Sequence, residues 1–169
     1  MPTINRAVVA RVAGATAVAI ALFTAQFEGF SNKVYVDPVG RHAVCVGHDS
    51  TGPDGKPLRA GDTYTEDMCS YLLGKDISKA EMAVTRIVKV PLSPGEKLAY
   101  TDFVFNEGSG NFASSTLVRK LNAGDHAGAC NELSRWDKAE VEGEAVALAG
   151  LTKRRAAERL VCLGDAAAR

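Results

Sequence analysis

The hydrophobic pattern of the chain differs between its first, middle and last parts. Residues 12–27 carry no charge and are mostly apolar. A short alternating stretch at 33–37, a Pro/Gly turn and a second β-rich run at 42–47 together predict a β-hairpin. A loop rich in Gly, Pro and Asp covers 49–62, and helical spacing of apolar residues begins after residue 65. The pattern predicts an α+β fold, with a small hairpin-containing lobe followed by a larger helical lobe.

Helix start signals divide the last part of the chain. Residues 93–96 form a capping box with proline at the first helical position. The residues that follow, up to Phe105, are apolar almost all round, which is typical of a central buried helix. We expect N-caps at Thr65, Ser93, Ser114 or Ser115, Asp125 and Thr152.

The final predicted helix carries both apolar and basic residues. Ala156, Leu160 and Leu163 fall on one face, which we expect to be the packed face. The basic side chains form a turn near the C-terminus, which we interpret either as a solvated helix face or as a surface that attracts an anionic polymer. These basic residues are Lys153, Arg154, Arg155 and Arg159.

Composition agrees with one folded domain behind an N-terminal segment. The chain has 169 residues, and a domain has roughly 150. Twenty Lys and Arg balance 20 Asp and Glu, and this zero net charge argues against a generally basic nucleic-acid binder. Hydrophobic residues make up 46%, which excludes a disordered chain. We therefore expect a folded protein with no nucleic-acid partner.

The apolar N-terminal run permits three interpretations. As a helix, its 16 residues span about 24 Å, which is short of the roughly 30 Å hydrocarbon core of a bilayer. It could be a cleaved signal peptide, a buried core helix or a marginal, uncleaved signal anchor, and we favour the anchor. Arg6 and Arg11 precede the run, which places the N-terminus in the cytoplasm and residues from Glu28 onward outside. The outer compartment is oxidising and allows disulfides.

Two carboxylates are candidates for catalysis. Glu28 ends the apolar run, and Asp37 lies nine residues later at the predicted hairpin turn. Phe27 and Phe30 would favour the neutral form of Glu28, whereas Asp37 in a polar turn would stay ionised. One protonated and one ionised carboxyl across a cleft can cleave a glycosidic bond. On spacing alone, two solvated surface carboxylates are the more common case.

A metal site is the weaker interpretation of the second strand. His42, Cys45 and His48 form an H-x₂-C-x₂-H pattern, but on a strand Cys45 faces away from the two histidines. A fourth ligand is not evident. We expect no metal, and we expect His48 to be a structural hydrogen-bonding residue. Trp136 could be a core residue or a platform for a sugar ring, and we favour the core.

Further motifs occur in a family-specific order. Glu28-Gly29, Asp37, Gly40 and residues 44–48 resemble the acid signature and the Gly-His strand end of the phage-type lysozymes, glycoside hydrolase family 24. Within that family the chain is most similar to the signal-anchor-release endolysins of lambdoid phages. Motifs of the family's helical lobe are matched in order by residues 105–112, 115–122, 128–130, 135–136, 150–155 and 158–159.

The resemblance implies a lysozyme-like fold with a cleft between its lobes, and a muramidase activity without a cofactor. Glu28 would be the general acid, and Asp37 the base or electrostatic partner in an inverting reaction. The substrate would be the β-1,4 bond between N-acetylmuramic acid and N-acetylglucosamine in bacterial peptidoglycan. Candidate cleft residues are Tyr35, His42, His48, Asn106, Gly110, Asn111 and Ser115.

The sequence departs from the family at Ala43, where the resemblance implies a threonine that holds the attacking water. Three explanations stay open: Ser50, Thr51 or His42 replaces the hydroxyl, the chain is an inactivated variant, or its lineage has lost activity. A catalytically silent peptidoglycan-binding protein is therefore the main rival hypothesis. A membrane-tethered structural protein with surface carboxylates is a more distant one.

The resemblance also implies regulation by the membrane. Residues 1–27 would be a releasable transmembrane signal anchor and 28–169 the catalytic domain of a monomer. The protein would be inactive at the inner membrane of the host and active once released into the periplasm. Since 1–27 contain no cysteine, we expect control without thiol exchange. Four cysteines allow three pairings, of which we favour Cys45 with Cys69 and Cys130 with Cys162.

Overall fold

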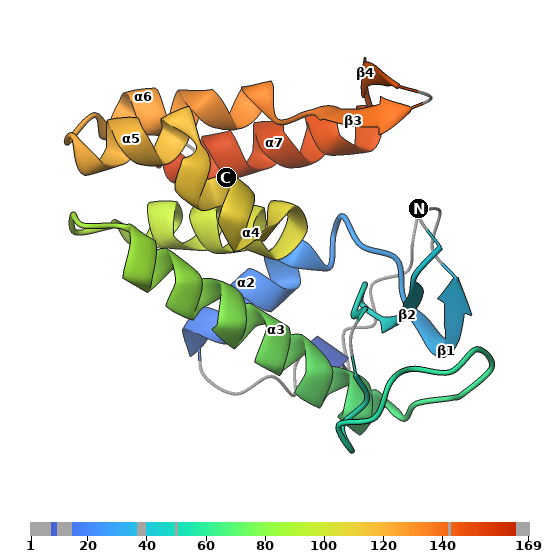
Figure 1. Ribbon diagram of the computed structural model, residues 1–169. Helices are drawn as coiled ribbons and strands as arrows, with labels where there is room; N and C mark the ends of the chain where they lie inside the picture. Colours follow the sequence, from blue (N-terminus) through green and yellow to red (C-terminus); the bar gives the residue numbers. More distant parts are fainter. Residues whose placement is uncertain (1–7, 10–14, 37–39, 50, 142, 165–169) are drawn as a thin grey trace. The chain divides into compact units, whose positions relative to one another are not determined.

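The computed structural model describes residues 8–9, 15–36, 40–49, 51–141 and 143–164 (Figure 1). The chain divides into two compact units, Met1–Lys79 and Ala80–Arg169. Helix α3 (Glu66–Ile87) runs through the boundary between them. Helices dominate, and two small antiparallel hairpins accompany them, so the predicted α+β class is confirmed.

Apolar residues from the N-terminal run are buried in the first unit. Helix α2 (Ala15–Thr24) covers part of that run, and its Ile20 is fully buried. Val8 is buried as well, and its carbonyl oxygen accepts a hydrogen bond from Ser70 Oγ of α3 at 2.8 Å. Among the described ranges, no helix combines the length and the apolar character that crossing a membrane requires.

The predicted β-hairpin is confirmed in the first unit. Strands β1 (Ser31–Val36) and β2 (His42–Cys45) pair antiparallel, and the turn at 37–39 lies outside the described residues. A disulfide joins Cys45 to Cys69, as favoured from the sequence, and so ties the end of β2 to α3. Closing a loop of this length contributes about 3–4 kcal/mol to stability in the chain-entropy model.

The second unit is built around α4 (Pro94–Ser114). Its capping box forms as predicted, because Ser93 Oγ accepts from the Glu96 amide and the Glu96 carboxylate accepts from the Ser93 amide. Trp136 packs edge-on against Phe103, with ring centroids 5.2 Å apart, so its predicted core position is confirmed. The largest buried apolar residues of this core include Tyr100, Phe103, Phe112, Leu117, Leu121 and Leu133.

Short elements complete the second unit before its last helix. The predicted caps at Ser115 and Asp125 are confirmed, since each side chain accepts a backbone hydrogen bond at the start of its helix. The second favoured disulfide, Cys130–Cys162, is also present. The elements are α5 (Thr116–Asn122), α6 (His126–Glu132), the 3₁₀ helix η1 (Leu133–Arg135), β3 (Lys138–Val141) and β4 (Glu144–Ala147).

The β3–β4 hairpin was missing from the sequence-based prediction. Polar and apolar residues alternate along β3, and Gly143 in the turn has a φ of +86°, a conformation that favours glycine. These signals could have predicted the hairpin. They are weak because β4 does not alternate and all of its residues are exposed, so it has no buried face.

The predicted cap of the last helix is wrong. Helix α7 (Ala149–Cys162) begins three residues before Thr152, and Leu148 occupies the N-cap position without a side-chain hydrogen bond. Thr152 lies within the helix, where its hydroxyl donates to Asp137 Oδ2 at 3.2 Å. A threonine three residues into a helix satisfies local hydrogen bonds as well as one at the cap, so the residue type alone misplaced the start.

The packed face of α7 is also different from the predicted one. Of the three predicted residues, Leu163 packs against the core, but Ala156 is exposed and Leu160 is 46% exposed. Arg154 and Arg155 are instead only 3% and 1% exposed. Neither interpretation of the basic turn therefore holds for these two arginines. Glu158 is fully buried beside them, so the buried face of α7 is charged.

Buried acidic partners explain this charged face. Arg154 donates from Nε and Nη2 to the two carboxylate oxygens of Asp102 on α4, both at 2.9 Å. Arg155 Nη2 lies 3.0 Å from Glu158 Oε1. Burial raises the pKa of Glu158 well above its usual value, against the opposing charge of Arg155. The charges are thus paired across α4 and α7.

Candidate active site

Glu28 lies just beyond the C-terminal end of α2. Its backbone amide donates to the Thr24 carbonyl oxygen at 3.3 Å, which continues the helical path past the last residue of α2. Phe23 and Phe27 pack together on this last turn, with ring centroids 5.3 Å apart. Glu28 itself is partly buried. The helix end therefore fixes the direction from which this carboxylate projects.

A tight turn after β2 receives the Glu28 carboxylate. Val44 and His48 close the turn with two backbone hydrogen bonds, at 2.9 and 3.0 Å. Gly47 within it has a φ of +70°, and a Cβ at this position would lie 3.3 Å from Glu28 Oε2. Glycine is thus favoured by backbone conformation and by the close approach of the carboxylate. Sequence reasoning missed this role, because residues 28 and 47 are far apart in the chain.

The other proposed catalytic residue, Asp37, lies outside the described residues, as does Ser50. The strands that flank Asp37 are described. Tyr35 is 41% exposed and pairs with Ala43 on β2. Ala43 is 3% exposed, so the position at which the family resemblance implies threonine is nearly enclosed.

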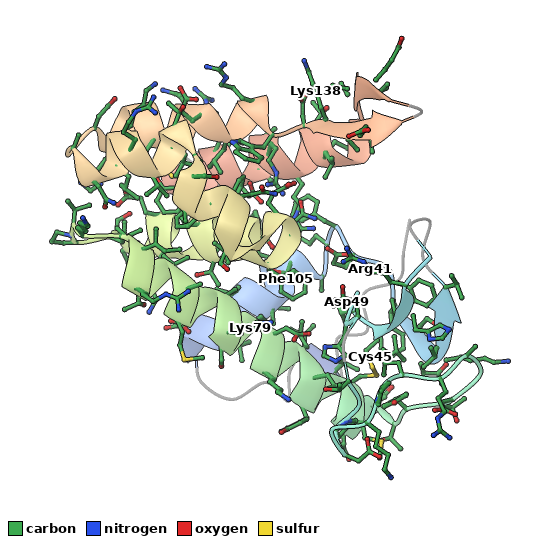
Figure 2. The ribbon with its side chains drawn as sticks, viewed as in Figure 1. Arg41, Cys45, Asp49, Lys79, Phe105 and Lys138 are labelled. Carbon is green, nitrogen blue, oxygen red and sulfur yellow. A yellow bond between two sulfur atoms is a disulfide. The ribbon has the colours of Figure 1, made fainter. Side chains whose placement is uncertain are left out.

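His42 and His48 have different surroundings. His42 is exposed, and its Nδ1 lies 3.0 Å from the carbonyl oxygen of Leu58. The intervening Cys45 is bound in a disulfide, so its sulfur is not available as a metal ligand, which contradicts the zinc hypothesis. Arg41 Nη1 and Asp49 Oδ2, on either side of this strand and turn, form an ion pair at 3.3 Å (Figure 2).

His48 is a buried structural residue, as the sequence analysis expected. Its Nδ1 lies 2.6 Å from Asp76 Oδ2 on α3, and its Nε2 donates to the Thr51 carbonyl oxygen at 2.8 Å. Two acceptors are best satisfied by a ring with a proton on each nitrogen. Burial alone would lower the pKa of His48, but the hydrogen bond to Asp76 and its charge outweigh burial and raise that pKa above 6.5.

We predict that His48 makes the stability of the protein depend on pH. Because its pKa is raised on folding, the stabilisation is fully present below the unfolded value of about 6.5 and is lost as pH rises through the folded value. His48→Asn should lower the free energy of unfolding by about 2–3 kcal/mol at pH 6 and by less at pH 9. Denaturant unfolding at both pH values measures this, and the exposed His42→Asn is the control. An equal loss at both values would contradict the prediction.

The remaining predicted cleft residues lie in the second unit. Asn106 Oδ1 accepts a hydrogen bond from Arg155 Nη2 at 2.6 Å, so the buried charge cluster of α7 extends to it. Gly110 and Asn111 are exposed beyond Gly108, whose φ of +85° interrupts α4. Ser115 is buried, and its side chain caps α5.

Arg155 also approaches a carboxylate that sequence analysis did not select. Its Nη1 lies 3.8 Å from Glu107 Oε1, next to the interruption at Gly108. Burial raises the pKa of Glu107, while the charges of Arg155 and Arg154 oppose that shift. The sequence did contain a signal for this contact: two arginines on α7 and several polar residues on α4. The signal identifies Glu107 as a partner only once the two helices are known to pack together.

Comparisons with known proteins agree with this fold and these motifs. A family model described as phage lysozyme matches residues 25–158. The SAR-endolysin of Bacteriophage PS119 is 39% identical over 96% of this chain and 95% of its own length, and that of Enterobacteria phage P21 is 38% identical over 96% of each.

Solved structures give the same result. The muramidase domain of SpmX from Asticaccaulis excentricus has a TM-score of 0.75 and 28% identity, and the match covers 96% of this chain and 99% of that domain. A P22 lysozyme mutant has a TM-score of 0.71 and 28% identity, and the match covers 96% of this chain and 99% of the P22 chain. The chain therefore belongs to the phage lysozyme family and is an enzyme of the lysozyme, or muramidase, type.

Proposed function

We propose that this enzyme is an endolysin that hydrolyses the β-1,4 bond between N-acetylmuramic acid and N-acetylglucosamine in bacterial peptidoglycan. The observation that carries this proposal is the position of Glu28, a partly buried carboxylate at a helix end, against the glycine of the turn after β2. A glycine offers no side chain there, so the carboxyl can approach a bound sugar without obstruction from that residue. The family membership supports the substrate class.

In the proposed reaction, Glu28 is the general acid. Its proton passes to the glycosidic oxygen as the bond to the anomeric carbon breaks, and the leaving sugar departs as an alcohol. Asp37 accepts a proton from a water molecule, whose oxygen attacks the anomeric carbon from the opposite face. The product has the inverted configuration. One proton leaves Glu28 and one is taken up by Asp37, so the reaction needs no cofactor.

Ala43 limits the rate in this proposal, because it provides no hydroxyl for the attacking water. We predict that Ala43→Thr raises kcat on peptidoglycan by about tenfold or more, since misplacement of a reacting group can cost about 10²-fold. Ala43→Val, which has a similar shape but no hydroxyl, is the matched control for the change in volume at this nearly enclosed position. Initial rates of reducing-end release measure both. Equal rates for the threonine and valine variants would contradict a role for the hydroxyl.

We further propose that the enzyme is held inactive in the inner membrane by residues 1–27 and becomes active on release. Two observations support this proposal. Val8 and Ile20, both within residues 1–27, are fully buried, so the same side chains can exchange a lipid environment for a protein one. Glu28 directly follows that segment, so retention in the bilayer would hold the carboxylate at the membrane boundary.

Two exposed positions allow release to be tested without disturbing the packed side of α2. Thr16 and Ala19 are exposed, so leucine at both raises the apolar character of the segment and leaves its buried face unchanged. We predict that Thr16→Leu/Ala19→Leu stays in the membrane pellet and gives less lysis than the parent. Thr16→Ser/Ala19→Ser is the control and should appear in the soluble fraction with full activity. Equal distribution of all three proteins would overturn membrane control.

A further inference from the structure

One face of α3 is exposed over most of the helix and carries a regular row of large side chains. Successive members of the row are three or four residues apart, so they share one face of the helix. With the rise of an α-helix, the row is about 27 Å long. We call it the α3 stripe, and its members are Met68, Tyr71, Lys75, Lys79, Met82 and Arg86.

The apolar members of the α3 stripe are not packed against the protein. Met68 is 43% exposed, Tyr71 is 56% exposed and Met82 is 66% exposed. Helix α3 is held in the fold by other side chains, among them Leu72 and Ile77, which are fully buried. A partner can therefore cover the α3 stripe without any change in the packing of the helix.

The charged members of the α3 stripe all carry a positive charge. Lys75, Lys79 and Arg86 are exposed, and none of them forms an ion pair with a residue that the structure describes. Lys79, which is labelled in Figure 2, comes between the apolar Tyr71 and Met82 in the row. Cationic and apolar side chains are thus interspersed along one exposed line.

The acidic residues in the middle of α3 do not neutralise these cations. Asp76 Oδ2 lies 2.6 Å from His48 Nδ1, and Glu81 forms an ion pair with Lys97. Both carboxylates are thus directed to partners elsewhere in the protein. The α3 stripe is therefore a local excess of positive charge in a chain whose formal net charge is zero.

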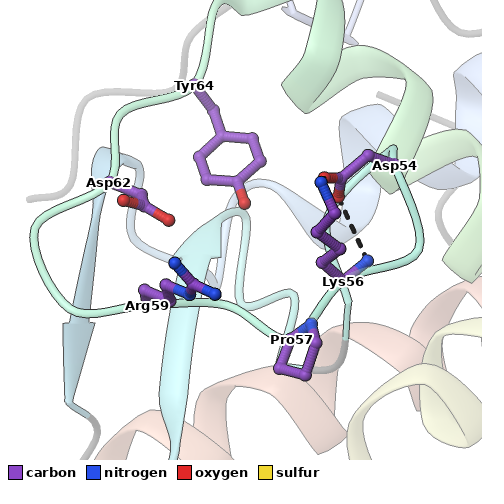
Figure 3. A pocket seen from close by; sticks show the side chains of 6 residues that line it. All are labelled: Asp54, Lys56, Pro57, Arg59, Asp62 and Tyr64. Carbon is purple, nitrogen blue, oxygen red and sulfur yellow. Dashed lines mark hydrogen bonds and ion pairs between the residues drawn. The ribbon is translucent and has the colours of Figure 1, made fainter.

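A second exposed polar surface, in the loop before α3, has no such excess. It is a small pocket that holds two acidic and two basic side chains (Figure 3). Lys56 Nζ and Asp54 Oδ2 form an ion pair there at 3.2 Å. Equal numbers of opposite charges give this pocket no preference for an anionic surface, so its cations serve as a control for those of the α3 stripe. The lining residues are Asp54, Lys56, Pro57, Arg59, Asp62 and Tyr64.

A partner of the α3 stripe has to pair with cations and cover apolar side chains at the same time. A dissolved anionic polymer would pair with the lysines and leave the methionines in water. A bilayer with anionic lipids provides both environments, because its charged headgroups lie directly above hydrocarbon. Lysine and arginine reach such headgroups with their long side chains while the apolar groups beside them enter the boundary layer.

We propose that the α3 stripe docks the released enzyme on a bilayer surface that contains anionic phospholipids. The inference rests on the proposed function, since the bilayer is the membrane that residues 1–27 are proposed to leave. The two contacts use different sides of α3. Ser70, whose Oγ donates to the Val8 carbonyl oxygen, is buried, whereas the α3 stripe is exposed. Docking would keep the released enzyme at the membrane surface.

Cosedimentation with vesicles tests this docking surface. The full chain, recovered from the soluble fraction, is mixed with vesicles of phosphatidylglycerol and phosphatidylcholine or of phosphatidylcholine alone. We expect tighter binding to the anionic vesicles, and weaker binding at high salt, because salt screens exposed charges. Lys75→Gln/Lys79→Gln should weaken binding to the anionic vesicles by about tenfold or more, because each cation near such a surface adds to the affinity.

The matched control for these charges is Lys56→Gln/Arg59→Gln, which removes two exposed cations from the pocket loop. It should bind the anionic vesicles as tightly as the parent does. Equal affinity in the parent and in Lys75→Gln/Lys79→Gln would overturn the proposal, as would an equal loss in the control, because binding would then depend on net charge and not on the α3 stripe.

A further variant separates a bilayer from an anionic polymer. Met68→Gln/Met82→Gln keeps every charge and removes the two exposed apolar side chains. It should weaken binding to the anionic vesicles by about tenfold, because the apolar contact with the boundary layer is lost. If it binds these vesicles as tightly as the parent, or if the parent binds inorganic polyphosphate and not the vesicles, the α3 stripe recognises an anionic polymer and the proposal is wrong.

Docking and membrane control fail in different measurements. If Thr16→Leu/Ala19→Leu stays in the membrane pellet while Lys75→Gln/Lys79→Gln binds vesicles like the parent, membrane control is supported and docking by α3 is overturned. If Thr16→Leu/Ala19→Leu is distributed like the parent while Lys75→Gln/Lys79→Gln no longer binds vesicles, docking is supported and membrane control is overturned.

Discussion

Replacement of Glu28 by glutamine is expected to abolish cleavage of peptidoglycan. An amide of nearly the same size keeps the packing against Gly47, where Glu28 Oε2 lies 3.3 Å from the position of a Cβ, but it has no acidic proton to give. General acid catalysis typically contributes about 10²–10⁴-fold, so the rate of reducing-end release should fall by at least about 100-fold. The thermal midpoint should change little, because Glu28 is only partly buried and glutamine has nearly the same size.

The matched control for this variant is Glu144→Gln on the exposed strand β4, which should retain the activity of the parent. Circular dichroism of both variants shows whether the fold is unchanged. If Glu28→Gln cleaves peptidoglycan as fast as Glu144→Gln, the proton donor is another residue.

Replacement of Arg154 by methionine is expected to give the largest loss of stability. Arg154 is 3% exposed and Asp102 is fully buried, so removal of the guanidinium leaves the Asp102 carboxylate in the core without its bidentate partner. Breaking such a pair costs about 3–5 kcal/mol. For a protein of this size, the thermal midpoint should fall by about 6–20 °C, and scanning calorimetry measures it.

Two further variants separate burial from charge. Lys97 pairs with Glu81 near the surface, with 41% of its side chain exposed, so Lys97→Met should cost less than about 1 kcal/mol. Arg154→Met combined with Asp102→Leu should recover part of the loss, because it removes both members of the pair. Equal losses in the free energy of unfolding for Arg154→Met and Lys97→Met would show that the buried pair stabilises the protein no more than the surface pair does.

Local signals explain which parts of the fold were predictable. The Ser93–Glu96 capping box and the first hairpin depend on residues that are close in the chain, so spacing alone located them. Thr152 shows the limit of such signals. A threonine near a helix start satisfies the pattern whether it occupies the cap or the first turn.

The packed face of α7 could not be read from hydrophobicity. Glu158 is buried beside Arg154 and Arg155, whose charges offset its own, and Arg154 is in turn paired with Asp102 on α4. Leu160, by contrast, is exposed. One clue was present in the sequence: Asp102 stands alone in an otherwise apolar segment, and a buried carboxylate requires a cationic partner. The clue indicates that a partner exists, but it does not say which arginine.

The candidate site was predictable in part for the same reason. Glu28 was selected from its place after the apolar run and from the family motif, both of which are visible in sequence. Its contact with Gly47 depends on how the hairpin folds onto the helix end, which no local pattern specifies.

Identification of the reducing ends in a digest tests the central claim most directly. Purified peptidoglycan is treated with the full chain, and the soluble fragments are analysed by mass spectrometry after borohydride reduction. We predict fragments that end in reduced N-acetylmuramic acid, with the glycan cut and the peptides intact. Fragments that end in reduced N-acetylglucosamine, or free peptides with uncut glycan, would contradict muramidase activity.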